Sequence, residues 1–81
     1  MAPEITIRQA TSDDAFALRR LAALDDARAL HGEVLLAEHA GDIRAALSLE
    51  TGRAIANPFA PTAELVEMLR VERRYVERLA A

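Results

Sequence analysis

The pattern of apolar and polar residues predicts β-strands in four segments of the chain, and in the first and third of them the two kinds of residue alternate with the period of two that is typical of strands. The four segments are residues 4–9, 33–40, 43–50 and 53–57. The second is almost continuously apolar, as expected of a strand covered on both faces. Short turns that contain glycine separate the last three segments, which predicts an antiparallel meander. The residues expected to share one face of the third segment are Ile43, Ala45, Leu47 and Leu49.

Elsewhere, apolar residues recur at the spacing of helices. Residues 11–14 are all polar, which is typical of a helix N-terminus, and the helix that they begin is predicted to end near Leu24. A second, short helix is predicted at residues 27–31 and is stopped by Gly32. A long amphipathic helix is predicted at residues 62–79.

The long helix carries a broad apolar face with one carboxylate in it. At about 100° per residue, seven apolar residues fall on one side of the helix, and Glu72 lies near the middle of them. The seven are Leu65, Met68, Leu69, Val71, Tyr75, Val76 and Leu79. The core is predicted to contain Leu18, Leu21, Leu36, Leu47 and Leu69.

Composition limits the size of the core and the kinds of partner. The chain has 81 residues, enough for one domain, and no cysteine that could supply a disulfide or a thiolate metal site. With two Phe, one Tyr and no Trp, the core buries a modest area, so a partner surface is expected. The net charge of -3 argues against a nucleic-acid partner. Without a secretory signal or a membrane-spanning apolar run, a cytoplasmic location with no membrane contact is expected.

The opening and the meander together resemble part of a known fold. The stretches ITIRQATSDDAFALRRLAALD and VLLAEHAGDIRAALSLETGRAIANPF are similar to the opening half of the GNAT acyltransferase fold, whose members are mostly N-acetyltransferases. The resemblance implies a single α+β half-domain over residues 1–81, a truncated GNAT-like fold with the element order β-α-α-β-β-β-α. Its sheet would be four-stranded and mostly antiparallel, with helices on its faces. The residues that match the family's opening are Ile5, Ile7, Arg8, Ala10, Asp14, Ala17, Leu18 and Leu21.

The turn that binds acetyl-CoA in this family differs here. GNAT proteins carry an Arg/Gln-Gly-x-Gly/Ala signature before a helix, and its glycines let backbone N–H groups approach the pyrophosphate. The corresponding residues 57–62 contain two prolines and no glycine. Tyr75 does not match the family's tyrosine general acid, because it lies on a different helix. No cofactor is therefore expected, and acetyl-CoA enters only under the alternative function given below.

No catalytic or metal-binding residue is expected from the sequence. Glu38 and Glu50 lie near strand ends, where a family-like site would need a base, but carboxylates at such positions are usually solvated. His31 and His39 have no partners at metal-ligand spacing and are expected at the surface.

The sequence therefore favours a non-catalytic GNAT-like module that acts by self-association or by binding a protein partner. The alternative is an acyl-CoA-dependent N-acetyltransferase, or a CoA-binding sensor, whose site is completed by a second chain. A homodimer is expected, because residues 53–57 would leave an open sheet edge and the last helix an incompletely buried face. The residues expected in the interface are Ile55, Met68, Glu72, Tyr75, Val76 and Leu79.

Overall fold

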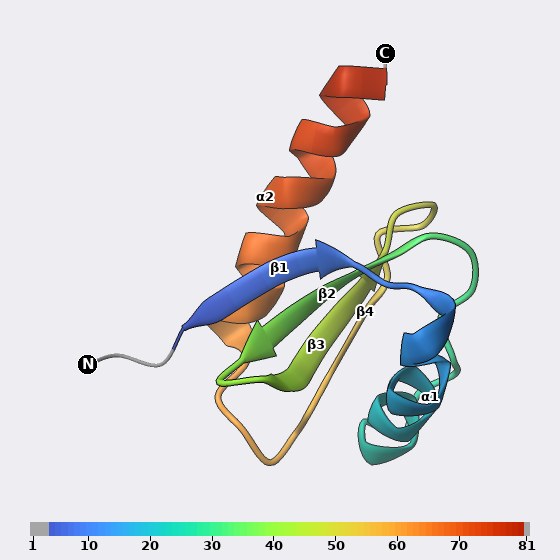
Figure 1. The fold of residues 1–81 in the computed structure, drawn as a ribbon, viewed down its shortest axis with the longest axis vertical. Helices are drawn as coiled ribbons and strands as arrows, with labels where there is room; N and C mark the ends of the chain where they lie inside the picture. The colour runs from blue at the N-terminus through green and yellow to red at the C-terminus, as the bar shows by residue number, and fades with distance from the viewer. Residues whose placement is uncertain (1–3, 81) are drawn as a thin grey trace.

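The four strands form one antiparallel sheet in the order β1-β2-β3-β4, as Figure 1 shows. The computed structural model describes residues 4–80, so the first three residues and the last residue of the expected domain lie outside it. The predicted meander is confirmed, and the first strand extends it by pairing with β2. The strands are β1 (Ile5–Gln9), β2 (Val34–His39), β3 (Asp42–Ser48) and β4 (Ala54–Ala56).

One helix lies on each face of the sheet, which confirms the α+β class. A single 3-10 turn, Ser12–Asp14, leads into α1 (Ala15–Leu24), and α1 packs on β3 and β4. The longer α2 (Ala63–Ala80) packs on β2 and β3 from the other face. Since neither helix packs extensively on β1, residues of that strand such as Ile5 and Thr6 remain exposed.

Residues 27–31 form no helix, so the predicted second helix is wrong. Asp26 adopts the left-handed conformation, with φ of 49°, and ends the helical path of α1. The following segment is held as a loop by Arg53, whose guanidinium donates to the carbonyl of Ala29 at 2.8 Å. A helix of five residues forms too few internal hydrogen bonds to offset the cost of its first turn.

The sheet divides the core into two clusters of buried side chains. Successive residues of a strand point to opposite faces, so β2 and β3 contribute to both clusters. The α1 cluster consists of Leu21, Ala22, Val34, Leu36, Ala46 and Ile55. The α2 cluster consists of Leu35, Ala37, Ala45, Leu47, Leu65 and Leu69. Four of the five leucines predicted for the core are buried, and Leu18 is half-buried at the margin of the α1 cluster.

A β-bulge in β3 changes which of its residues share a face of the sheet. Ala37 pairs with Ala45 but Glu38 pairs with Ile43, which leaves Arg44 as the extra residue of β3. Ile43 therefore packs on the α1 cluster, whereas Ala45 belongs to the α2 cluster. The prediction that these two residues share a face is wrong, because one inserted residue shifts the alternation by one position.

Arg8 links three elements through two carboxylates. Its guanidinium donates to both carboxylate oxygens of Asp14 at 2.8 Å and, through Nε, to Glu38. Asp14 also accepts a hydrogen bond from the backbone N–H of Thr11 at 2.7 Å. The hydrogen bonds from Arg8 and then from Thr11 hold the pKa of Asp14 well below its usual range. The bonds to Asp14 and then to Glu38 raise the pKa of Arg8.

The Asp14→Asn variant is expected to melt at a lower temperature than the wild type at pH 7, because Arg8 loses its charged bidentate acceptor. A carboxyl whose folded-state pKa is lowered stabilises the fold above its unfolded-state pKa of about 4, and this contribution is lost as the pH falls through the folded-state pKa. The difference in melting temperature should therefore be full at about pH 7 and shrink below about pH 4. Thermal melts followed by circular dichroism measure it.

The matched control is Asp13→Asn, which removes the same charge from the exposed neighbouring residue. An equal loss of melting temperature in both variants, or a difference that grows as the pH falls, would contradict the role assigned to Asp14.

Candidate functional site

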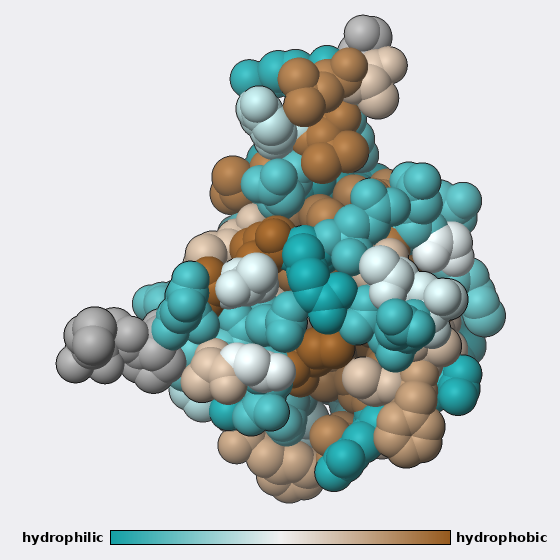
Figure 2. Space-filling model, in the orientation of Figure 1, coloured by the Kyte–Doolittle hydropathy of each residue, from teal (hydrophilic) through white to brown (hydrophobic). Residues whose placement is uncertain are grey.

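α2 carries a line of exposed apolar side chains beside the face that it buries. Leu65 and Leu69 are buried against the sheet. The exposed residues are three or four positions apart, so they lie one above another along the helix. Figure 2 shows apolar surface along the part of α2 that stands out from the rest of the molecule. This line, here called the α2 stripe, consists of Met68, Val71, Tyr75 and Leu79, which are 40%, 56%, 56% and 69% exposed.

Arg73 fixes the point at which α2 leaves the sheet. Its guanidinium donates to the carbonyls of Leu49 at 3.0 Å and Glu50 at 3.3 Å, next to the turn that joins β3 to β4. Gly52 in this turn makes room for the contact, since a Cβ added there would lie 2.8 Å from the Arg73 guanidinium and its φ is 77°. Beyond this anchor the last turns of α2 extend past the sheet, as Figure 1 shows. Part of the stripe is therefore presented away from the rest of the fold.

The stripe borders a hollow between α2 and β1. Ile7 of β1 and Met68 and Val71 of the stripe line this hollow, and Glu67 and Glu72 add carboxylates to it. Its volume is about 360 Å³. Ile7 packs against the α2 cluster, so it lies on the same face of the sheet as the helix. The hollow therefore joins the stripe to the part of β1 that α2 leaves uncovered.

Five of the six residues predicted for an interface lie on α2, and one lies elsewhere. Three of the five belong to the stripe, while Glu72 and Val76 are half-buried beside it. Ile55 is buried in the α1 cluster on the opposite face of the sheet, so its side chain cannot join the same surface. Val71 belongs to the stripe but is missing from the predicted set, although its helical spacing places it on the same side.

The edge strand β4 is poorly suited to pair with another strand. It has three residues, and the hydrogen bonds at its two ends show that Ala54 and Ala56 direct their backbone groups away from β3. The outward N–H of Ala56 donates to the carboxylate of Asp25 at 3.1 Å. β4 is thus an edge strand of the sheet, as expected for residues 53–57, but a carboxylate after α1 already occupies one of its outward donors.

The longer open edge belongs to β1. This strand has five residues and, among residues 4–80, pairs only with β2. Along an antiparallel strand, the backbone groups of successive residues point alternately towards and away from the neighbouring strand. The N–H of Ala10 donates to the carbonyl of Val34, so the backbone groups of Ile5 and Ile7 point away from β2. Sequence reasoning missed this edge, because alternation predicts that a strand forms but not where it lies in the sheet.

The loop before α2 uses its backbone donors within the chain. The N–H groups of Phe59 and Ala60 donate to the side chain and the carbonyl of Asn57, at 2.8 Å and 3.3 Å. Pro58 and Pro61 have no N–H to offer. Residues 58–61 therefore offer none of the free donors with which a glycine-rich turn holds a pyrophosphate.

The carboxylates and imidazoles considered as catalytic groups are not brought together. Glu38 is held by Arg8, and Glu50 is exposed in the turn after β3. His31 precedes β2 and His39 is the last residue of that strand, so the two histidines lie towards opposite ends of it. Among residues 4–80, no group of three or more His, Asp and Glu side chains is placed to hold a metal ion.

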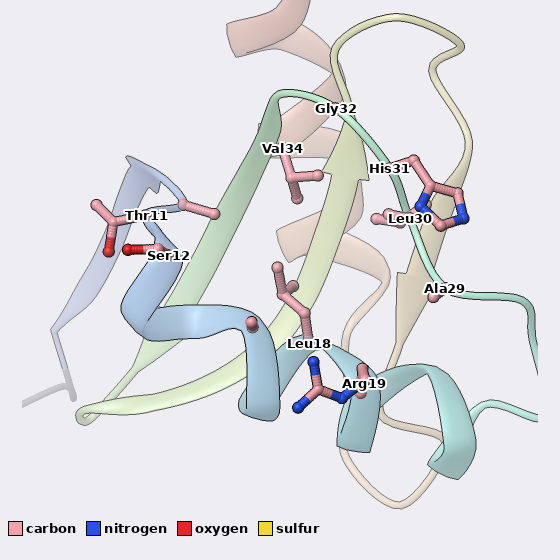
Figure 3. Close-up of a pocket in the computed structure, with 11 residues that line it drawn as sticks. Thr11, Ser12, Leu18, Arg19, Ala29, Leu30, His31, Gly32 and Val34 are labelled. Carbon is pink, nitrogen blue, oxygen red and sulfur yellow. The ribbon is translucent and has the colours of Figure 1, made fainter.

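A second hollow lies between α1 and residues 29–32, as Figure 3 shows. Its volume is about 440 Å³, and Leu18 and Leu30 are among the residues that line it. Arg19 and His31 also line this hollow, and both are exposed to solvent. Within the described part of the chain no buried side-chain polar atom lacks a hydrogen-bond partner. The hollow therefore shows no buried polar group that would orient a ligand.

Comparison of the chain with protein-family models, with curated proteins and with solved structures gives no match. Neither helix within residues 4–80 combines the length and the apolar character needed to cross a membrane. Of the eight large apolar side chains that are exposed within residues 4–80, four lie together in the α2 stripe.

Proposed function

We propose that the chain is a non-catalytic module that acts by self-association, and that two copies form a homodimer through the α2 stripe. The observation that carries this proposal is the line of four exposed apolar side chains on a helix that extends past its own sheet. Contiguous apolar surface on a protein commonly marks a contact with another molecule. A second copy presents the same surface, so one two-fold axis covers both stripes at once.

The small core gives an energetic reason for the same contact. The largest fully buried side chains are Leu36, Leu47, Ile55 and Leu69, so a chain of 81 residues has few large apolar groups inside. Covering one exposed apolar side chain of the stripe contributes on the order of 1 kcal/mol. The eight side chains of two stripes together contribute roughly 8 kcal/mol, which is comparable to the cost of association of about 4–15 kcal/mol.

The scaffold that presents the stripe is proposed to be GNAT-like. Support comes from the matching residues of the opening and from the order of the sheet, with α1 and α2 on opposite faces. In this proposal the loop at residues 57–62 is a structural turn, since Asn57 accepts the N–H groups of Phe59 and Ala60.

Self-association makes the melting temperature depend on protein concentration, because mass action favours the dimer at high concentration. The wild-type chain is therefore expected to melt several degrees higher at roughly 200 µM than at roughly 2 µM. The matched control carries Val71→Ser and Leu79→Ser, which removes two exposed groups of the stripe, and its melting temperature should not change with concentration. A wild-type melting temperature that is equally independent of concentration would contradict the proposal.

Acetyl-CoA is expected not to bind the purified chain at micromolar concentrations, because residues 58–61 before α2 offer no free backbone donor and no glycine. Isothermal titration calorimetry measures this directly. A saturating isotherm would overturn the non-catalytic assignment and favour the CoA sensor or the acetyltransferase. Repeating the titration with a stripe variant separates these two, because an acetyltransferase site completed by a second chain would lose acetyl-CoA binding together with association.

A further inference from the structure

Charges along α2 are divided between its two halves. Up to Glu72 the helix contains Glu64, Glu67 and Glu72 but only one arginine, whereas from Arg73 onward it contains three arginines and one glutamate. Favourable interaction with the helix dipole explains charges only in the first and last turns. Glu67 and Glu72 lie beyond the first turn, so the dipole does not account for them.

Glu67, Arg74 and Arg78 lie on one flank of the α2 stripe, and the first and last of them have opposite charge. Glu67 and Arg78 are both exposed, and they are separated by close to three full turns at about 3.6 residues per turn. They therefore lie on the same side of the helix, one near each end of the stripe. Glu67 also accepts a hydrogen bond from Arg70 at 2.9 Å, which leaves its carboxylate at the surface.

An antiparallel second copy of α2 matches these charges. A two-fold axis perpendicular to the helix reverses its direction and brings the same flank of each copy together. Glu67 of each copy then faces Arg78 of the other, whereas a parallel two-fold arrangement would place the same flank of each copy on opposite sides of the interface and leave these residues without each other as partners. The midpoint between Glu67 and Arg78 and the midpoint of the stripe differ by about one residue, or about 1.5 Å along the axis. One axis therefore brings Glu67 of each copy opposite Arg78 of the other and also places the stripe of one copy on the stripe of the other.

We propose that the partner of the stripe is the α2 helix of a second copy that runs antiparallel, and that Glu67 and Arg78 select this orientation. This inference rests on the proposed self-association. The arrangement places Leu79 of the second copy over Met68, at the hollow that Ile7 also lines. The arginine-rich end of the second α2 thus meets the hollow that carries two carboxylates, and it covers the part of β1 left uncovered within one chain.

Reversal of each charge tests the orientation. Glu67→Arg or Arg78→Glu alone replaces two attractive contacts per dimer by two repulsive ones, so each variant is expected to dissociate about tenfold more readily than the wild type. The double variant with both reversals restores opposite charges across the axis and should recover nearly wild-type affinity. Sedimentation velocity over a concentration series measures all four proteins, and far-ultraviolet circular dichroism verifies that each is folded. The effect of the single reversals should shrink in about 1 M salt, where charges are screened within about 3 Å.

Arg20→Glu is the matched control, because it makes the same charge change at an exposed position of α1 and should leave the affinity unchanged. Single reversals without effect, or a double variant no tighter than the singles, would overturn the antiparallel arrangement while self-association stood. A wild-type chain that is monomeric up to about 200 µM would overturn both proposals, so the two failures are distinguishable.

Discussion

The Leu69→Ala variant is expected to lose about 2–5 kcal/mol of unfolding free energy, because truncation leaves a cavity that the surrounding side chains fill only partly. Leu69 is 0% exposed and lies in the α2 cluster with Leu47 and Leu65. A domain of this length has a total stability of roughly 4–12 kcal/mol, so the variant loses a large part of it. Urea denaturation followed by circular dichroism measures the change, at one fixed protein concentration because self-association adds to stability.

The same substitution at Leu24 serves as the control. Leu24 is 40% exposed at the end of α1, and its truncation should cost about 1 kcal/mol or less. If Leu69→Ala were no more destabilising than Leu24→Ala, α2 would not pack on the sheet through Leu69.

Tyr75→Glu is expected to weaken the homodimer about a hundredfold while the isolated chain keeps its fold. Tyr75 is 56% exposed, so a charge there meets water in the monomer but would be buried without a partner in the middle of the proposed interface. Phe16→Glu is the matched control, since Phe16 is an exposed aromatic residue on α1, across the sheet from α2. It should leave the dissociation constant unchanged. Equal effects of the two substitutions would indicate general loss of solubility rather than loss of a specific contact.

Local patterns predicted most of the secondary structure. Alternation identified the first and third strands and short apolar runs identified the second and fourth, while the period of α2 identified its bounds to within one residue at each end. These patterns depend on which side of a segment is buried, and that information is present in the segment itself. The shared α2 face that contains Leu65 and Leu69 could therefore be read from the sequence alone.

Contacts between distant residues decided the features that the sequence did not reveal. The bulge at Arg44 depends on how β2 and β3 align, and the loop at residues 27–31 depends on a hydrogen bond from Arg53. The edge of β4 was expected to be open, but Asp25, far away in sequence, occupies one of its donors. None of these pairings leaves a periodic signal in the chain.

The candidate site was predictable in composition but not in extent. Helical spacing placed Tyr75 and Leu79 on an apolar face, but it could not show how much of that face the sheet covers. The answer depends on the anchor between Arg73 and the turn after β3, beyond which α2 extends past the sheet. The separation of Ile55 from this surface likewise follows from the side of the sheet on which each helix packs.

Sedimentation equilibrium of the wild type and of Tyr75→Glu tests most directly whether the α2 stripe joins two copies of the chain. Between roughly 5 and 100 µM the wild-type molar mass is expected to rise from near the chain mass of 8.8 kDa towards twice that value, while Tyr75→Glu stays near 8.8 kDa. A wild-type mass of 8.8 kDa throughout this range, or a dimer that Tyr75→Glu leaves intact, would contradict self-association through the stripe.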